Sequence, residues 1–228
     1  MPYPLKVKCS AFSLNRDERL RAYVLEYFPH AVFGSTEENP PQEELLRFVA
    51  DAEALIVGRE RVDETFLKAC PRLKVISKYG VGLDNIDEEA CRKRNIPVLH
   101  TSGVNRNCVA ELTLGFILAA LHNICFSDRL IKSGLWQKEG GHDLAGKTVG
   151  IVGLGNVGSR LAELLFPFGV RLLVCDILDK SKELKRWPGS QQVPLEQLLR
   201  ESDVVSLHVP LTPATRYMIS KRELQWMK

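Results

Sequence analysis

Short apolar runs alternate with stretches of helical periodicity along the chain, and this alternation restricts the possible folds more than any other feature. In the first hundred residues the apolar runs predict strands at Leu5–Cys9, 31–33, Ala54–Val57, Lys74–Ser77 and Pro97–Leu99. Helical patterns separate them, from about Asn15 to Phe28, after Pro41, at 63–69 and at 87–94. Strands joined by helical crossovers run parallel, because each crossover returns the chain to the same end of the sheet. Residues 1–101 are therefore predicted to form a flavodoxin-like α/β domain.

A second alternating series predicts a second parallel sheet. Residues 101–106 are small and polar and mark the crossing between the two domains, where a hinge is expected. A long helix is then expected from Cys108 to Ser133, with Gly134 as its C-terminal cap. The later elements are strands at 148–152, 170–175 and 203–207 and helices at 156–168 and 195–200. Residues 102–228 are thus predicted to be a Rossmann-type domain that is incomplete at its C-terminal end.

A glycine-rich turn joins the strand at 148–152 to the following helix. It has the spacing G-x-G-x-x-G, in which the glycines permit a tight turn, close approach of a diphosphate, and packing of helix on strand. Asp176 ends the next strand, where a carboxylate accepts hydrogen bonds from the ribose of NAD and repels the 2′-phosphate of NADP. The alternative is a plain turn beside a solvated aspartate. The predicted NAD-binding residues are Gly153, Gly155, Asn156, Val157, Gly158 and Asp176.

Composition argues against several other classes of protein. The 31 basic and 28 acidic residues are interspersed, without the basic run that a nucleic-acid partner usually requires. The six cysteines are far apart and show no zinc spacing, so we expect reduced, mostly buried thiols, a cytoplasmic protein and no metal site. No apolar stretch approaches the length of a membrane span, and the N-terminus lacks an apolar signal core. We therefore expect neither nucleic acid nor a membrane as a partner.

Five sequence blocks, in order, resemble the D-isomer-specific 2-hydroxyacid dehydrogenases, and most closely the phosphoglycerate dehydrogenase-like members. They are Lys78–Asp87, Asn105–Thr113, Gly134–Trp136, Leu144–Gly150 with the glycine turn, and Leu207–Pro213. The resemblance covers nearly the whole chain. It implies an NAD-dependent oxidoreductase that transfers hydride between the cofactor and a small 2-hydroxy or 2-oxo acid, possibly one similar to 3-phosphoglycerate. It also makes residues 1–101 the substrate domain.

The resemblance also implies roles for individual residues. The amides of Val81 and Gly82 would bind the substrate carboxylate, as a nest of backbone N–H groups can, although a plain strand-to-helix turn is the alternative. Arg59 and Lys78 are candidate cations for substrate specificity, or else solvated charges at strand ends. Val109 would lie near the nicotinamide or in the core. His208, Pro210 and Thr212 would line the adenosine half of NAD, and the helix at 108–133 would pair two copies of the chain.

The acid/base residues of the family have no counterpart in these 228 residues. In the resembling enzymes an arginine, a glutamate and a histidine perform this chemistry, and the arginine belongs to an Arg-Gly segment that would follow Lys228. The chain is therefore expected to be a truncated or frameshifted enzyme, a fragment, or a shortened protein, and to lack turnover by itself. The rival functions are a non-catalytic NAD-binding sensor or interaction module and a binder of S-adenosylmethionine or another nucleotide.

Overall fold

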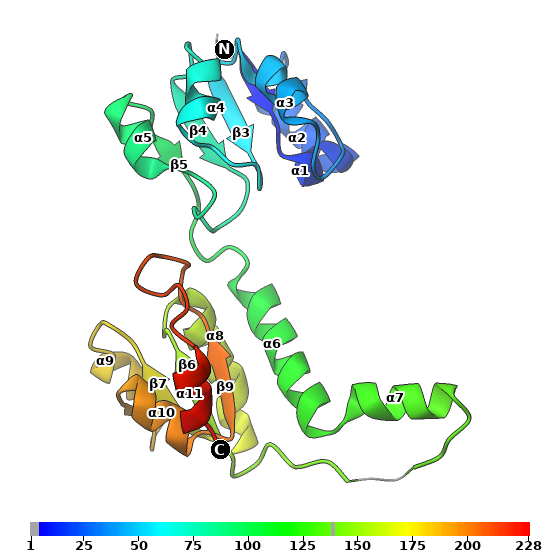
Figure 1. The fold of residues 1–228 in the computed structure, drawn as a ribbon, viewed down its shortest axis with the longest axis vertical. Coiled ribbons are helices and arrows are strands. Elements are labelled where there is room, and N and C mark those ends of the chain that lie inside the picture. Colours follow the sequence, from blue (N-terminus) through cyan, green and yellow to red (C-terminus); the bar gives the residue numbers. More distant parts are fainter. Residues whose placement is uncertain (1–4, 138–139) are drawn as a thin grey trace. The chain divides into compact units, whose positions relative to one another are not determined.

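The computed structural model describes residues 5–137 and 140–228, which form two compact units, Met1–Ser102 and Gly103–Lys228. The boundary expected from the sequence, between residues 101 and 102, lies one residue away. Each unit is built around its own parallel sheet (Figure 1). The α/β class with parallel sheets is therefore confirmed.

The first unit has the strand order of a flavodoxin-like domain. Its five strands pair in parallel in the order β2-β1-β3-β4-β5. The strands are β1 (Val7–Cys9), β2 (Val32–Phe33), β3 (Ala54–Val57), β4 (Val75–Lys78) and β5 (Val98–Leu99). The helices are α1 (Phe12–Arg16), α2 (Glu18–Tyr27), α3 (Gln42–Val49), α4 (Glu64–Ala69) and α5 (Glu88–Lys93). The carboxyl ends of β1, β3 and β4 thus lie along one edge of this sheet.

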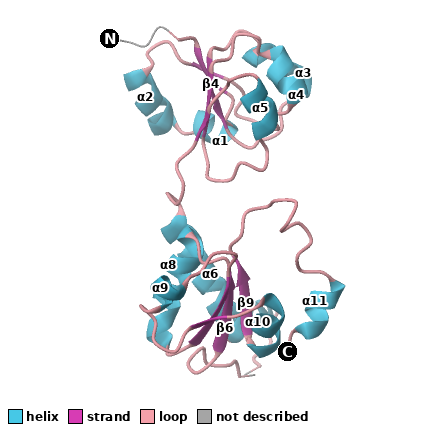
Figure 2. Ribbon diagram, turned by 90° about the vertical axis from the view of Figure 1, so that its left-hand side faces the viewer, coloured by secondary structure: helices cyan, strands magenta, loops and turns pink. Residues whose placement is uncertain are grey.

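Helices cover both faces of the first sheet (Figure 2). Leu55 and Val57 of β3 belong to a core with α3, α4 and α5, whereas Ile56 packs with residues of α1 and α2 on the opposite face. Successive side chains of a strand point to opposite faces, so a continuous apolar strand supplies both cores. The burial of Leu55 alone stabilises the unit by about 1.5–3 kcal/mol.

The helix expected from about Asn15 to Phe28 is present as α2, Glu18–Tyr27, but its start was predicted too early and the short helix α1 before it was not predicted. Asp17 lies between α1 and α2 in an extended conformation, and its carboxylate accepts hydrogen bonds from the N–H groups of Arg19 and Leu20. An aspartate that caps a helix in this way begins a new one. The apolar spacing was correct for α2, but it did not reveal the break before it.

The second unit contains the first four strands of the Rossmann strand order. Its strands pair in parallel in the order β8-β7-β6-β9, which corresponds to 3-2-1-4 within the unit. The strands are β6 (Thr148–Val152), β7 (Arg171–Cys175), β8 (Gln191–Gln192) and β9 (Val204–Leu207). The helices are α6 (Arg106–Leu121), α7 (Ile124–Lys132), α8 (Asn156–Leu165), α9 (Ser181–Leu184), α10 (Leu195–Glu201) and α11 (Lys221–Trp226), with a 3₁₀ turn at Phe166–Phe168. The short elements α9 and β8 had not been predicted.

The second sheet is also covered on both faces. Val149 and Ile151 pack with α6 and α8, while Val152 packs with α10 and α11 on the other side (Figure 2). A Cβ at Gly150 would lie 2.4 Å from a methyl group of Leu198, so α10 can rest on β6 only where the strand has a glycine. This close packing fixes the strand that leads into the glycine turn.

The helix predicted from Cys108 to Ser133 is bent by 63° at residues 122–123, so it is two helices. Asn123 has φ of +54° at the break, a left-handed conformation that asparagine tolerates better than most residues. Gly134 does end α7 as predicted: φ is +80°, and the N–H groups of Gly134 and Leu135 donate to the carbonyls of Ile131 and Leu130.

No single helix in the described ranges is long and apolar enough to cross a membrane. The bent pair α6 and α7 passes that test together, on length and composition only.

The cysteines are less buried than predicted. Cys9, Cys70 and Cys91 are buried and Cys175 is half-buried, but Cys108 and Cys125 are exposed on α6 and α7. Burial raises the pKa of the Cys9 thiol to about 12, so this thiol is inert at neutral pH. No disulfide joins any of the six.

Candidate functional site

The glycine turn has the shape that its spacing predicts. Gly153 has φ of +92°, and its N–H donates to the carbonyl of Cys175 at 2.7 Å. A Cβ at Gly153 would lie 2.6 Å from the carbonyl oxygen of His208, and a Cβ at Gly158 would lie 2.1 Å from that of Gly153. Both positions therefore require glycine, since any side chain would push α8 or the loop after β9 away from β6.

Gly155 is different, because the space around it is open. Nothing lies within 4 Å of the position where its Cβ would be, and the residue is exposed. It is the N-cap of α8, and Asn156 and Val157 are the first residues of that helix. The first amides of a helix have no partner within it, and the helix dipole makes this end positive. An anion can thus approach the backbone at this point.

Asp176 lies beside this turn, at the carboxyl end of β7. Its Oδ2 accepts a hydrogen bond from the N–H of Leu154 at 2.7 Å, and its Oδ1 accepts one from Leu178 at 2.9 Å. The side chain is half-buried. A carboxylate has about four acceptor positions, so two remain for a ligand. The structure brings Asp176 and the glycine turn together, as the sequence predicted.

A polar hollow of about 410 Å³ adjoins Gly155 and Asn156, and sequence reasoning had missed the cations that line it. They are Arg106, Arg160, Lys180 and Arg186, with Glu163 as the acid among them. Arg160 and Arg186 each contact Glu163 at 3.1 Å, and the buried Nε of Arg160 has no hydrogen-bond partner in the described part of the chain. The spacing of Arg160, four residues after Asn156 on one helix, could have revealed it. The lining is strongly cationic, which favours phosphate groups.

His208 follows β9, and its surroundings favour a neutral imidazole. Its backbone N–H donates to the carbonyl of Val152 at 2.8 Å, and Nε2 of its imidazole lies 2.8 Å from the hydroxyl of Ser206. Burial lowers the pKa of the imidazole below its ordinary value. Thr212 and exposed Pro210 are held in a turn by Thr215, whose hydroxyl donates to the carbonyl of Pro210 at 2.6 Å. This turn begins just beyond the carboxyl edge of the second sheet.

Val109 lies in the first turn of α6 and is half-buried. Its carbonyl accepts a hydrogen bond from the hydroxyl of Thr113 at 2.7 Å. Its neighbour Ala110 is fully buried in the core with α8, so Val109 is near the edge of that core.

In the first unit, Val81 and Gly82 lie in the loop that follows β4. Tyr79 anchors this loop by donating its N–H to the carbonyl of Val57 at 2.8 Å, and Gly80 has φ of +136°. Within the described residues, the amides of Val81 and Gly82 donate to no other group. Gly82 is exposed and Val81 half-buried, so both can be reached by a small anion.

The two candidate cations of the first unit differ in their surroundings. Arg59 is exposed, forms an ion pair with Glu38 and stacks on Phe12 at 5.2 Å. An exposed pair of this kind contributes about 0–1 kcal/mol, so the ion pair holds Arg59 only weakly. Lys78 is half-buried, and its ammonium donates to the carbonyl of Gly58 and to the side-chain oxygen of Asn85. It does not extend into solvent as a solvated strand-end charge would.

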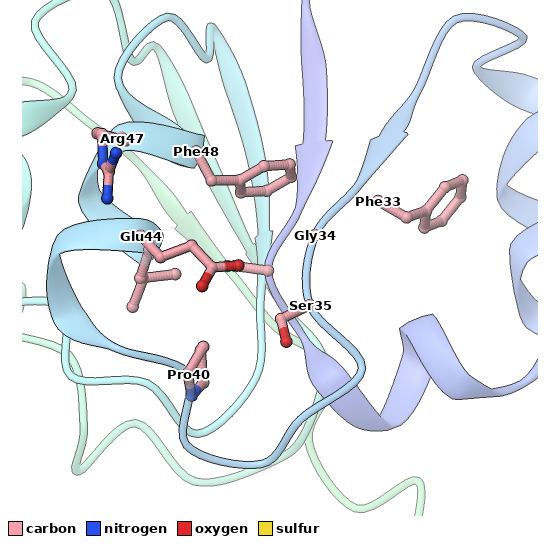
Figure 3. A pocket seen from close by; sticks show the side chains of 9 residues that line it. Phe33, Gly34, Ser35, Pro40, Glu44, Arg47 and Phe48 are labelled. Carbon is pink, nitrogen blue, oxygen red and sulfur yellow. The ribbon is translucent and has the colours of Figure 1, made fainter.

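A further hollow of about 750 Å³ lies between α3 and the ends of β1 and β2 (Figure 3). Glu44, Arg47 and Phe48 line it from the helix, and Gly34 and Ser35 line it from the loop after β2 (Figure 3). A Cβ at Gly34 would lie 3.0 Å from the ring of Phe48, so the ring rests directly on the backbone. None of the site residues predicted from the sequence lines this hollow.

No group of three or more histidine, cysteine, aspartate or glutamate side chains in the described ranges could hold a metal ion. The candidate sites are the glycine turn with Asp176 in the second unit and, in the first unit, residues 79–85 after β4, the amide loop.

Comparison with known proteins identifies the family. Residues 114–228 match the family described as "D-isomer specific 2-hydroxyacid dehydrogenase, NAD binding domain". The chain belongs to the D-isomer-specific 2-hydroxyacid dehydrogenase family. The glycine turn and Asp176 thus belong to the NAD-binding domain of this family, whose cofactor is NAD.

Individual members of the family are similar over most of the chain. A glyoxylate reductase of Thermofilum pendens is 40% identical over 210 residues, which cover 86% of this chain and 60% of the relative. A hydroxypyruvate reductase of Thermotoga maritima is 35% identical over 196 residues, which cover 85% of this chain and 63% of the relative. The structure of a D-lactate dehydrogenase of Aquifex aeolicus, complexed with NAD and lactic acid, has a TM-score of 0.85 at 27% identity and covers 98% of this chain and 66% of that one. The chain spans about 60% of the length of the curated relatives it matches.

The residues at the glycine turn fit NAD. Gly155 leaves room for a diphosphate at the start of α8, the adjoining hollow supplies cations, and Asp176 has acceptor positions left for ribose hydroxyls. The first two features match the diphosphate of the cofactor, and the third matches its adenosine ribose.

Proposed function

We propose that the chain is part of an NAD-dependent reductase of small 2-oxo acids such as glyoxylate or hydroxypyruvate. The observation that carries this proposal is the position of Asp176, whose carboxylate lies at the N–H of Leu154 next to the open backbone of Gly155. The names of the glyoxylate and hydroxypyruvate reductases that resemble the chain support the substrate class. NAD supplies the hydride acceptor or donor at C4 of its nicotinamide ring, and the protein supplies binding and orientation.

In this proposal each residue has a separate binding task. The amides of Gly155, Asn156 and Val157 hold the diphosphate, and Asp176 accepts hydrogen bonds from the adenosine ribose. His208, Pro210 and Thr212 form the wall around the adenosine, and the lowered pKa of the imidazole suits a packing role. Val109 contacts the nicotinamide.

Residues 1–101 form the substrate domain in this proposal. The free amides of Val81 and Gly82 bind the carboxylate of the 2-oxo acid, because two N–H groups with no internal partner can both donate to one anion. Arg59, which is exposed at the end of β3, is available for the remainder of a larger substrate.

The helices α6 and α7 are proposed as the surface through which two copies associate. Their exposed large apolar residues include Leu112, Phe116, Ile124, Phe126 and Ile131, with Trp136 beyond them at 83% exposure. Apolar surface of this extent on adjacent helices is typical of a protein interface. Sedimentation equilibrium of the chain and of the Phe116→Ser variant tests this: a monomeric wild type contradicts the proposal.

Calorimetric titration of NAD and NADP into the 228-residue chain tests the proposed function. We expect NAD to bind at least about tenfold more tightly, since the Asp176 carboxylate repels a 2′-phosphate. Equal affinity, or no binding of NAD, would contradict it.

No Arg-Gly dipeptide occurs in the sequence, so we expect binding without turnover of NADH and glyoxylate. Family-like turnover by this polypeptide would refute that expectation, and the same assay on a longer chain separates a reductase from a non-catalytic NAD-binding module.

A further inference from the structure

Lys78 occupies an unusual place for a lysine, because its ammonium group is engaged inside the protein. The residue ends β4 and is half-buried, and its Nζ donates to the carbonyl of Gly58 and, at 2.6 Å, to Oδ1 of Asn85. Gly58 directly follows the neighbouring strand β3, and Asn85 lies at the far end of the amide loop. Lys78 therefore links the loops that follow two adjacent strands.

Asn85 completes this link with its other side-chain atoms. Its Nδ2 donates to the carbonyl of Glu60 at 2.6 Å and to that of Gly58 at 3.2 Å. The backbone carbonyl of Asn85 accepts a hydrogen bond from the N–H of Val62 at 2.8 Å. The amide loop, residues 79–85, is thus tied at its end to the segment 58–62, while Tyr79 ties its beginning to β3.

The carboxylates around Lys78 offset part of the effect of its burial. Glu60 accepts hydrogen bonds from the N–H of Gly58, at 2.9 Å, and from the hydroxyl of Ser10. Burial lowers the pKa of the Lys78 ammonium, and the carboxylates of Glu60 and Asp84 act in the opposite direction. An ammonium group has three donors, and two are already directed to Gly58 and Asn85. One donor remains, so the ammonium group can direct more than one N–H at a phosphate only if the carbonyl of Gly58 or the side-chain oxygen of Asn85 loses a hydrogen bond.

We propose that Lys78 is a positioning residue, which holds the amides of Val81 and Gly82 in place for the carboxylate of an unphosphorylated 2-oxo acid and does not itself bind a substrate phosphate. The proposal rests on the proposed function for the identity of the ligand. The positioning role stands on the hydrogen bonds to Gly58 and Asn85, which exist without a ligand.

Backbone ¹⁵N relaxation of the whole chain tests the positioning role without any ligand. Lys78→Met removes both hydrogen bonds, and we expect lower heteronuclear NOE values at residues 79–85, with unchanged values in the helices of the first unit. Lys74→Met is the matched control, since Lys74 precedes the same strand and forms an exposed ion pair with Glu53. Lys78→Arg should restore the NOE values in part. Unchanged order of the loop in Lys78→Met would overturn the proposal.

Titration with two probes in the presence of NAD tests the substrate class. Glyoxylate is unphosphorylated and 3-phosphohydroxypyruvate is phosphorylated, and the amide shifts of Val81 and Gly82 report binding of each. We expect glyoxylate affinity to fall about tenfold or more in Lys78→Met and not in Lys74→Met. A variant that loses affinity for the phosphorylated probe alone would show that Lys78 is a phosphate ligand. If glyoxylate leaves the amide shifts of Val81 and Gly82 unchanged in the wild type, the proposed carboxylate site is refuted. The relaxation measurement tests the positioning role of Lys78 independently of that result.

Discussion

Replacement of Asp176 by asparagine separates the binding of NAD from that of NADP. The substitution keeps the size of the side chain but removes its charge and one of its two acceptor oxygens. In the structure these oxygens accept hydrogen bonds from the N–H groups of Leu154 at 2.7 Å and of Leu178 at 2.9 Å. Asparagine has a single acceptor oxygen, so it can accept hydrogen bonds from only some of these N–H groups and ribose hydroxyls.

The expected size of the effect follows from the hydrogen bonds. A hydrogen bond to a charged group contributes about 1.5–3 kcal/mol, which corresponds to a roughly 10- to 150-fold change in the dissociation constant when one bond to the ribose is lost. Loss of the charge also removes the repulsion of a 2′-phosphate. Affinity for NAD should therefore fall about tenfold or more in Asp176→Asn, while affinity for NADP stays the same or rises.

Isothermal titration calorimetry of both cofactors measures this directly. Asp179→Asn is the matched control, because Asp179 is exposed three residues further along and caps only Ser181. The control should bind NAD like the wild type. If Asp176→Asn bound NAD with unchanged affinity, the ribose would not lie on this carboxylate, and the reasoning about cofactor choice would be refuted.

Three further perturbations have defined outcomes. Gly158→Ala places a Cβ 2.1 Å from the carbonyl oxygen of Gly153, so thermal unfolding should show a loss of stability of more than 1 kcal/mol, as a rough minimum; an unchanged Tm contradicts the close packing of α8 on β6. Arg160→Gln should weaken ADP-ribose but not adenosine in calorimetry, since only the former has a diphosphate; equal losses would instead indicate a role in folding. Glu223 caps α11 by accepting from the N–H of Ser220, and hydrogen bonds from the hydroxyl of Ser220 and from Arg222 lower the pKa of its carboxyl to about 2. Its stabilisation is complete above the ordinary glutamate pKa and is lost as the pH falls toward 2, so a carbon-13 titration midpoint near the ordinary value would contradict the cap.

The sequence was sufficient for the order and type of most elements and for the glycine turn. Alternation of apolar strands with amphipathic helices forces parallel sheets, and the three glycines have fixed steric roles that spacing alone reveals. The position of Asp176 beside Leu154 follows from the adjacency of β6 and β7, which the crossover rule implies.

Breaks within apolar helices were not predictable in this way. Between Cys108 and Ser133 the apolar pattern continues through the bend, and the backbone departs from helical geometry at His122 and Asn123. Asp17 is a comparable case, because an aspartate within an amphipathic pattern fits either a helix surface or a new cap. The Asp17 cap decided one break and the left-handed backbone of Asn123 marks the other, and periodicity revealed neither.

The partners of charged side chains were also beyond the sequence. Lys78 was predicted to be a substrate cation or a solvated charge. In the structure it donates hydrogen bonds to Gly58, 20 positions before it, and to Asn85, 7 positions after it. The cations around Glu163 come from α6, α8 and the region of α9, so no short motif contains them. Contacts of this kind arise only when distant segments are brought together by the fold.

A crystal structure of the chain grown with saturating NAD tests the central claim most directly. The diphosphate should lie within hydrogen-bonding distance of the amides of Asn156 and Val157, with both adenosine ribose hydroxyls on the Asp176 carboxylate. NAD bound elsewhere, or a glycine turn that stays empty while NAD saturates the protein in solution, would contradict the assignment.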